Sequence, residues 1–419
     1  MGQTSFIHPA QGVLFAEGIS LEAIAKEFGT PTYVYSKNTL IQTFESFKKG
    51  LLKTDHLICF AVKANSNIAI LNLFASLGAG FDIVSGGELE RVIYAGGDPQ
   101  KIVFSGVGKT ESEIVVALKA NILCFNVESR SELTRIQEVA EKINIRASIS
   151  IRVNPDVDAK THPYISTGLK DNKFGVDFNQ ALSLYLDAKS MSYIDIKGID
   201  CHIGSQITEL KPFLDALDRV LSLVDQLKKN NIHLSHIDIG GGIGICYQDE
   251  SPPDFEIYIK EILNKIKDLN VKIIFEPGRA LVGNAGVLLS KVEYLKQNDI
   301  KHFAIIDAAM NDLMRPTLYD AYHEIKLVRE HDDAKPQSFD VVGPVCESGD
   351  FIAKNRSLKL KENDLICIMS AGAYGMSMSS NYNSRGRAAE VMVDQDKLYE
   401  IRTREKSSDL FKLEKKLPL

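Results

Sequence analysis

The chain has 419 residues, of which 44% are hydrophobic and 25% are charged, as in an ordinary globular protein. This length exceeds the size at which one hydrophobic core usually stops growing, so two domains are expected. The formal net charge of −6 provides no overall basic field. That balance argues against nucleic acid or an anionic membrane as the main partner.

The six cysteines are scattered along the chain and form no CxxC pair, which suits neither a disulfide framework nor a structural zinc site. The N-terminal sequence MGQTSFIHPAQG lacks a basic stretch followed by an apolar core, and no apolar run approaches the length of a membrane span. We therefore expect a protein of the reducing cytoplasm that binds no metal.

In chain order, the first predicted elements are a short helix at Leu21–Phe28 and a strand at Thr32–Ser36. Short apolar or β-branched runs then alternate with longer segments of helical period, such as Phe213–Leu227 and Phe255–Leu269. Eight strands over some 240 residues favour a (β/α)8 barrel over a doubly wound sheet. They are expected at His56–Val62, Ala79–Val84, Lys101–Phe104, Ile122–Val127, Ala147–Val153, Ile194–Ile203, Leu234–Ile239 and Val271–Phe275.

After Gly283 the pattern changes to strand-like runs with turn residues between them and little helix. This change predicts a mostly antiparallel β domain of roughly 135 residues. We expect a barrel domain over residues 37–283 and a β-rich domain made of residues 1–36 and 284–419. The runs in the second domain are Gly286–Leu295, Tyr322–Val328, Phe339–Val345, Leu365–Met369 and Ala388–Leu398.

Polar and glycine-rich motifs lie just after the predicted barrel strands, where (β/α)8 barrels build their active sites. Their convergence on one end of the barrel indicates a functional site there. The motifs are Lys63, Asp82 with Ser85-Gly86-Gly87, Asn154, Asp200 with His202 and Ser205, Gly240-Gly241-Gly242-Ile243-Gly244, and Glu276-Pro277-Gly278-Arg279.

Lys63 ends a strongly apolar run, in the string FAVKAN. In a closed pocket the charged amine would be desolvated, its pKa would fall, and the free base could form a Schiff base with an aldehyde cofactor. Taken alone, a lysine just past a buried strand is more often a solvated cap. Its place among the other motifs favours a covalent anchor.

The glycine run from Gly240 to Gly244 lets successive backbone N–H groups point into one concavity that can bind phosphate. It lacks the G-x-G-x-x-G spacing of a dinucleotide site, while a plain flexible turn remains open. A Schiff-base lysine with a phosphate site suggests pyridoxal phosphate, which needs a partner at its pyridine nitrogen, and a carboxylate there keeps that nitrogen protonated. Glu276 is placed for that contact, and the alternative is an ion pair with Arg279 on a solvated loop.

Eight strings between residues 60 and 385 carry a resemblance to a known family. By them the chain resembles the fold-type III pyridoxal-phosphate decarboxylases of amino acids, which are related to ornithine decarboxylase and alanine racemase, and most closely those that act on diaminopimelate. The strings are FAVKAN, FDIVSGGEL, HIGSQ, DIGGGIG, EPGR, MRPTLYDAYH, VVGPVCESGD and AGAYGMSMSSNYNSR.

The resemblance implies the residue roles. Lys63 would bear the cofactor, His202 would stack on its ring, and Cys346 would donate a proton to the product. The cofactor-binding set would also contain Ser205, Gly240, Gly241, Gly242, Glu276, Gly278, Arg279 and Tyr374. The substrate-binding set would contain Arg279, Arg315, Tyr319, Glu347 and Tyr374. Since the family places its cysteine and acidic residue in the neighbouring subunit's site, a homodimer with shared active sites is implied.

Each role has a structural alternative. His202 could be a satisfied core histidine, and Cys346 a small buried hydrophobe. Arg315 and Tyr319, four residues apart, could be an ordinary surface pair.

The implied reaction is decarboxylation of meso-2,6-diaminopimelate to L-lysine and carbon dioxide, the last step of lysine biosynthesis. Arginine forks suit the distal carboxylate, and Glu347 suits the distal ammonium. Ornithine or lysine would leave the arginines unpaired, a penalty of about 2 to 5 kcal/mol for a buried charge. Alternatives are a decarboxylase of another basic amino acid or of a carboxylated polyamine, an alanine racemase, and a catalytically inactive binding protein.

Overall fold

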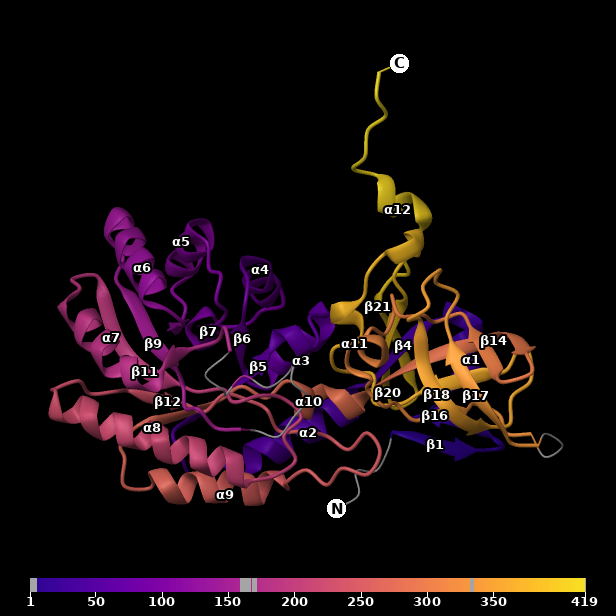
Figure 1. Cartoon of the computed structure of the whole chain (residues 1–419), viewed down its shortest axis with the longest axis horizontal. Helices are drawn as coiled ribbons and strands as arrows, with labels where there is room; N and C mark the ends of the chain where they lie inside the picture. The colour runs from indigo at the N-terminus through magenta and orange to yellow at the C-terminus, as the bar shows by residue number, and fades with distance from the viewer. Residues whose placement is uncertain (1–5, 159–166, 168–171, 332–334, 419) are drawn as a thin grey trace. The chain divides into compact units, whose positions relative to one another are not determined.

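The computed structural model describes residues 6–158, 167, 172–331 and 335–418. The chain forms two compact units, shown in Figure 1. The barrel unit comprises Gln42–Cys246 and Glu250–Leu281, and the β unit comprises Met1–Ile41, Tyr247–Asp249 and Val282–Leu419. None of the helices in the described ranges is long and apolar enough to cross a membrane.

Eight parallel strands of the barrel unit pair in a closed ring, because β13 pairs with β5 and β8 pairs with β9. This arrangement confirms the predicted (β/α)8 barrel. The two-residue strand β10 (Val176–Asp177) extends the sheet beside β9. The ring strands are β5 (His56–Ala61), β6 (Gly80–Ile83), β7 (Ile102–Phe104), β8 (Cys124–Val127), β9 (Ala147–Asn154), β11 (Ile194–Asp200), β12 (His236–Asp238) and β13 (Lys272–Phe275).

Helices cover the outside of this sheet, as Figure 1 shows for α4 to α9. Several begin with a side-chain cap close to the preceding strand: Ser85 caps α4, and Thr110 with Glu113 forms a capping box on α5. The helices are α2 (Lys37–Lys49), α3 (Ile68–Ser76), α4 (Gly86–Tyr94), α5 (Glu111–Ala120), α6 (Arg130–Ile143), α7 (Phe178–Ser190), α8 (Lys211–Lys229) and α9 (Phe255–Ile266).

The barrel interior changes from apolar to polar along the strands. Cys59 and Cys124 belong to a buried apolar cluster, together with Leu57, Val103 and Ile274. Two residues after Cys124 on the same face of β8 comes the buried Asn126, and the buried Asp200 and Asp238 end β11 and β12. The carboxyl end of the barrel therefore buries a group of polar side chains.

The main sheet of the β unit runs β18-β17-β15-β14-β4-β20-β21, with β19 on β14 and β16 on β19. Its pairs are antiparallel except β15–β17 and β4–β20, which confirms a mostly antiparallel domain. The strands are β4 (Thr32–Ser36), β14 (Gly286–Gln297), β15 (His302–Ile306), β16 (Ile325–Leu327), β17 (Gln337–Val342), β18 (Phe351–Leu358), β19 (Leu365–Ile368), β20 (Ala389–Asp394) and β21 (Lys397–Arg402).

The remaining elements of this unit are short. A three-stranded sheet of β1 (Ile7–Ala10), β2 (Val13–Ala16) and β3 (Ile19–Ser20) precedes α1 (Leu21–Phe28). This unit also contains helices α11 (Arg315–Tyr319) and α12 (Ser407–Phe411). Helix α10 (Arg279–Val282), most of which belongs to the barrel unit, completes the list of α-helices in the described ranges.

Several strands of the β unit differ from the sequence-based expectation, among them β1, β2 and β3, which were not expected. The run Ala388–Leu398 is two strands, β20 and β21, joined by a tight turn at Gln395, whose φ is +59°. Strands β15 and β18 were not expected, and β18 exposes Lys354 and Asn355, so that its pattern resembles a polar loop. Exposed edges of a sheet carry little of the apolar signal by which strands are recognised.

Candidate active site

Lys63 lies where the chain leaves the first barrel strand, in the 3-10 turn η1 (Val62–Ala64). Its Nζ donates to Oδ2 of Asp82 at 2.6 Å. Asp82 is fully buried on the neighbouring strand β6, whereas the lysine side chain is 36% exposed. The buried carboxylate therefore holds the amine at the open end of the barrel.

The glycine run from Gly240 to Gly244 forms a loop that passes close to the backbone of the loops after β11 and β13. Gly240 and Gly242 have φ values of +68° and +113°, which side chains disfavour. A Cβ on Gly241 would lie 2.1 Å from the backbone oxygen of Glu276, and one on Gly242 would lie 2.5 Å from that of Gly204. Glycine is therefore favoured at these positions, and a glycine turn of this kind can present backbone N–H groups to a ligand such as phosphate.

His202 follows β11, and its Nδ1 lies 3.1 Å from the backbone N–H of Gly241, which donates to it. The ring is thus neutral, with its proton on Nε2. Burial, with Arg152 and Lys63 nearby, holds the pKa of His202 well below its ordinary value. A flat, neutral, partly exposed ring suits stacking on an aromatic cofactor.

Ser205 and Arg279 contact each other on the loops after β11 and β13. Both Nε and Nη2 of Arg279 donate to the Ser205 hydroxyl, at 3.4 and 3.2 Å. Arg279 is buried at the start of α10. Gly278 before it fits closely, because a Cβ there would lie 3.0 Å from the side chains of Ala61 and Ala64.

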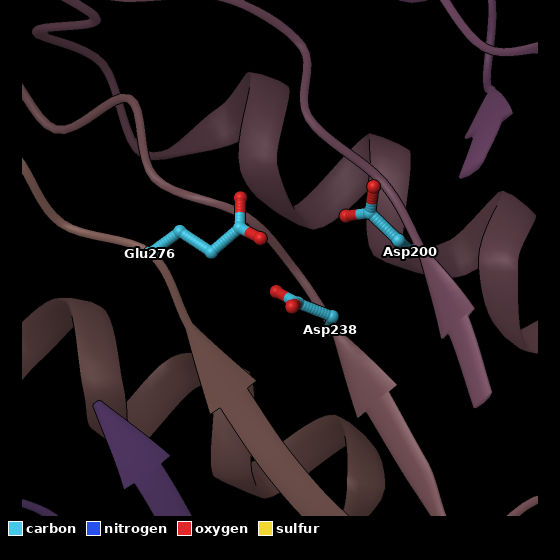
Figure 2. Close-up of side chains that lie close together, drawn as sticks. All are labelled: Asp200, Asp238 and Glu276. Carbon is cyan, nitrogen blue, oxygen red and sulfur yellow. The ribbon is translucent and has the colours of Figure 1, made fainter. Parts of the chain in front are cut away.

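Glu276 belongs to a cluster of three buried carboxyl groups with Asp200 and Asp238 (Figure 2). Their side chains converge from the ends of β11, β12 and β13, with carboxyl oxygens within 4.8 Å of one another. Nδ2 of Asn126 donates to Glu276 at 3.4 Å, and Nε of Arg152 lies 3.9 Å from Asp200.

The electrostatics of this cluster favour bound protons or a bound cation. Burial, followed by repulsion from the neighbouring carboxylates, raises the pKa of Glu276 well above its ordinary value. The same causes act on Asp238, and burial raises the pKa of Asp200 to about 7 although Arg152 opposes it. A protonated nitrogen beside Glu276 would relieve this repulsion.

These residues fit pyridoxal phosphate. The structure brings together an amine for the aldehyde, a glycine loop for the phosphate, a flat ring for stacking and a buried carboxylate for the pyridine nitrogen. All of the predicted barrel residues lie in this one group: Lys63, His202, Ser205, Gly240, Gly241, Gly242, Glu276, Gly278 and Arg279.

The other predicted residues belong to the β unit. Arg315 is only 5% exposed, lies 4.4 Å from the ring centroid of Tyr247, and donates to Nε2 of His323 at 2.8 Å. His323 in turn contacts the backbone oxygen of Met369 through Nδ1 at 2.8 Å. Arg315 is therefore a buried, fixed guanidinium and not part of an ordinary surface pair with the half-buried Tyr319.

Cys346 and Glu347 are both exposed, on the loop between β17 and β18. The backbone N–H of Cys346 donates to Oδ1 of Asn383 at 2.7 Å, and Thr317 of α11 donates to the Gly349 oxygen at 2.9 Å. Cys346 is thus not a small buried hydrophobe. Tyr374, half-buried after β19, has a left-handed φ of +55°.

Sequence reasoning included Asp82 among the polar motifs without giving it a role, and it did not name Asn126, Arg152 or Asp238. These four residues form the floor of the site. The signal available was a single polar residue inside an otherwise apolar strand, as in ISIRVN and HIDIGGG. In a closed barrel a polar side chain that points inward meets the inward-pointing side chains of the neighbouring strands. Because buried polar groups need hydrogen-bond partners, such side chains are expected to gather in one polar group.

The fold and this site define a pyridoxal-phosphate enzyme of the barrel type, and the family model of the pyridoxal-binding domain of pyridoxal-dependent decarboxylases matches residues 37–283. Two curated relatives are each 55% identical to this chain: diaminopimelate decarboxylase of Pseudomonas aeruginosa, with 97% of both chains covered, and that of Vibrio cholerae, with 99% of both covered. The chain belongs to the diaminopimelate decarboxylase family.

A solved relative agrees in structure as well as in sequence. The diaminopimelate decarboxylase of Helicobacter pylori complexed with L-lysine superposes with a TM-score of 0.91 at 45% identity, covering 94% of this chain and 98% of that one. Because the agreement extends over nearly the whole of both chains, it includes both units.

Proposed function

We propose that this chain decarboxylates meso-2,6-diaminopimelate to L-lysine and carbon dioxide with pyridoxal 5′-phosphate, as the last step of lysine biosynthesis in the cytoplasm. One observation carries the proposal: an amine, a glycine loop and a buried glutamate converge at one end of the barrel. The family to which the chain belongs supports it.

In this function Lys63 would hold the cofactor covalently, His202 would stack on its ring and Glu276 would bind its pyridine nitrogen. Ser205, the three glycines 240 to 242 and Tyr374 would hold its phosphate, with Gly278 and Arg279 beside them. When bound, pyridoxal phosphate supplies an electron sink for the electron pair left on Cα as the carboxylate departs.

The protein's own residues set the proton positions. Asp82 holds the Lys63 amine at the barrel mouth, 2.6 Å away, and would keep it there when substrate displaces it. The Glu276 carboxylate would hold a proton on the pyridine nitrogen, which makes the ring a stronger electron acceptor. His202, being neutral, adds no competing positive charge above the ring.

Substrate choice would depend on the far end of the substrate. We assign Arg279, Arg315 and Tyr319 to the distal carboxylate and Glu347 to the distal ammonium. Arg315 supports this assignment, since Tyr247 and His323 fix it and little side-chain entropy remains to be lost on binding. Lysine and ornithine lack the second carboxylate and would offer these guanidiniums no anion to bind.

Cys346 would donate a proton from Sγ to Cα, and we assign it and Glu347 to the neighbouring subunit's site in a homodimer. Their exposure on the 343–350 loop supports the assignment, because both side chains are accessible to another chain. The bond between Thr317 and Gly349 ties this loop to the helix that carries Arg315.

The test is to incubate the purified protein and pyridoxal phosphate with meso-diaminopimelate, ornithine and lysine in parallel. Carbon dioxide is measured and the amine product is resolved chirally. We expect L-lysine, from diaminopimelate alone. Carbon dioxide from ornithine or lysine would overturn the substrate while keeping the cofactor, and none from any of the three would favour an inactive binding protein.

A further inference from the structure

Asp238 lies at the centre of the floor of the site and has no assigned role. Its side chain is fully buried. Oδ1 accepts the backbone N–H of Gly240 at 2.8 Å, while Oδ2 has no hydrogen-bond partner among the described residues. In Figure 2 the Asp238 carboxyl group points toward that of Glu276, and the carboxyl oxygens of Asp238, Glu276 and Asp200 lie within 4.8 Å of one another.

The charges around this cluster do not balance. Arg152 reaches both Glu128, at 3.3 Å, and Asp200, at 3.9 Å. Lys63 reaches Asp82 at 2.6 Å. Below the cluster, burial raises the pKa of the thiols of Cys59 and Cys124 well above the ordinary value, so they carry no charge, and His202 above it is neutral. Among the residues that the structure describes, these two cations therefore face five carboxyl groups, counting Asp238 and Glu276.

Three carboxyl groups so close together in a buried site cannot all be ionised. Asp200 has the guanidinium of Arg152 beside it. Glu276 has the Asn126 amide and, on the proposed function, the pyridine nitrogen of the cofactor. Asp238 has a single backbone donor on one oxygen, so a retained proton is best placed on its other oxygen, Oδ2.

We propose that Asp238 is a positioning residue that stays protonated and donates a hydrogen bond from Oδ2 to the Glu276 carboxylate. This inference rests on the proposed function, since it concerns the residue assigned to the pyridine nitrogen. A hydrogen bond to the ionised form of Glu276 lowers its proton affinity, so the proton stays on the cofactor nitrogen. It also fixes the direction of the carboxylate.

Asp238 also joins two parts of the site. The same carboxyl group accepts the N–H of Gly240, the first residue of the glycine loop. One side chain thereby connects the group that would bind the pyridine nitrogen to the loop that would bind the phosphate. Loss of Asp238 is therefore expected to weaken cofactor binding as a whole.

Asparagine distinguishes a protonated aspartate from an ionised one. In Asp238→Asn the amide oxygen still accepts from Gly240 and the amide nitrogen can donate to Glu276, so it imitates the acid. Asp238→Ala can do neither. We expect the asparagine variant to keep its pyridoxal phosphate affinity within about threefold, and the alanine variant to lose about ten- to a hundredfold. Equal losses in both would overturn the proposal.

Infrared spectra of the protein loaded with pyridoxal phosphate test the proton directly, because Glu276 is expected to be ionised when the pyridine nitrogen is bound beside it. Burial raises the pKa of Glu88 and of Asp200 to about 7. At about pH 8, roughly one unit higher, these two carboxyl groups are therefore mostly ionised. We expect the wild type to show the carbonyl band of a buried carboxylic acid, Asp238→Asn to lose it, and the matched control Asp200→Asn to keep it. A wild type without the band, or loss of the band in the control, would contradict the proposal.

These spectra need neither substrate nor the alanine variant, which could fail to fold. A protein that binds pyridoxal phosphate but releases no carbon dioxide from diaminopimelate would refute the proposed function, and the spectra would still decide the state of Asp238. Turnover with no acid band in the wild type would refute this inference alone.

Discussion

At the scale of single residues, Lys63 is the clearest test of the site. Lys63→Ala is expected to abolish turnover and the absorbance of the lysine-bound cofactor together, because no other described amine contacts Asp82. The measurements are the visible spectrum with pyridoxal phosphate and the release of carbon dioxide from diaminopimelate.

Lys63→Arg is the matched control for this variant. Arginine keeps a cation beside the buried Asp82 but cannot bond to an aldehyde, so the fold is preserved while activity stays absent. Turnover retained by either variant would remove Lys63 from the role assigned to it.

Residues also differ in how readily the sequence reveals them. Lys63 and Glu276 follow strands, so their position in the chain predicted their place in the barrel. Asp238 and Arg152 lie within strands, and their meaning depends on the inward direction of their side chains. Periodicity in short strands that are buried on both faces does not provide that direction.

At the scale of elements, the Glu113 side chain connects the first turns of the barrel helices α4 and α5. Glu113 completes the capping box of α5 by accepting the backbone N–H of Thr110 at 2.9 Å, and it also accepts that of Gly86 at 2.8 Å. Gly86 is the first residue of α4. One carboxylate therefore satisfies a backbone donor at the start of each helix.

Glu113→Ala is expected to lower the free energy of unfolding at neutral pH by about 1 to 2 kcal/mol. These hydrogen bonds, led by that from Gly86, lower the pKa of Glu113. A lowered pKa in the folded state stabilises the fold above the unfolded value of 4.5, and the stabilisation is lost as the pH falls through the folded value.

Urea denaturation across that pH range checks this expectation. Glu111→Gln is the control, since Glu111 is fully exposed and pairs only with Lys142 among the described residues, so a smaller effect is expected. A Glu113→Ala penalty that stayed constant into acid would show that the carboxylate charge contributes nothing.

The elements themselves were predictable to different extents. Barrel strands such as β5 and β9 are buried on both faces, so their apolar runs stand out in the sequence. In the β unit, β18 exposes polar residues and β20 and β21 are separated by a turn of only two residues. The fold class was therefore recognisable, while the edges of the second sheet were not.

At the scale of the whole molecule, the proposed shared active site can be tested with hybrids of two defective chains. Cys346→Ala alone is expected to slow turnover about a hundredfold and to keep the absorbance of the cofactor, since a proton donor is lost and no cofactor contact. Lys63→Ala alone is expected to be inactive. Each chain retains what the other lacks.

If Cys346 acts in the partner's site, a hybrid dimer of Lys63→Ala and Cys346→Ala chains contains one site with both native residues and one with neither. Random association makes about half of the dimers hybrids, each with one of two sites restored, so co-refolded chains should regain about a quarter of wild-type activity. Mixing Lys63→Ala with Glu276→Gln should restore nothing, because both residues belong to the same barrel. Absence of recovery in the first mixture, with hybrids verified by differently tagged chains, would place Cys346 within its own subunit's site or outside the site altogether.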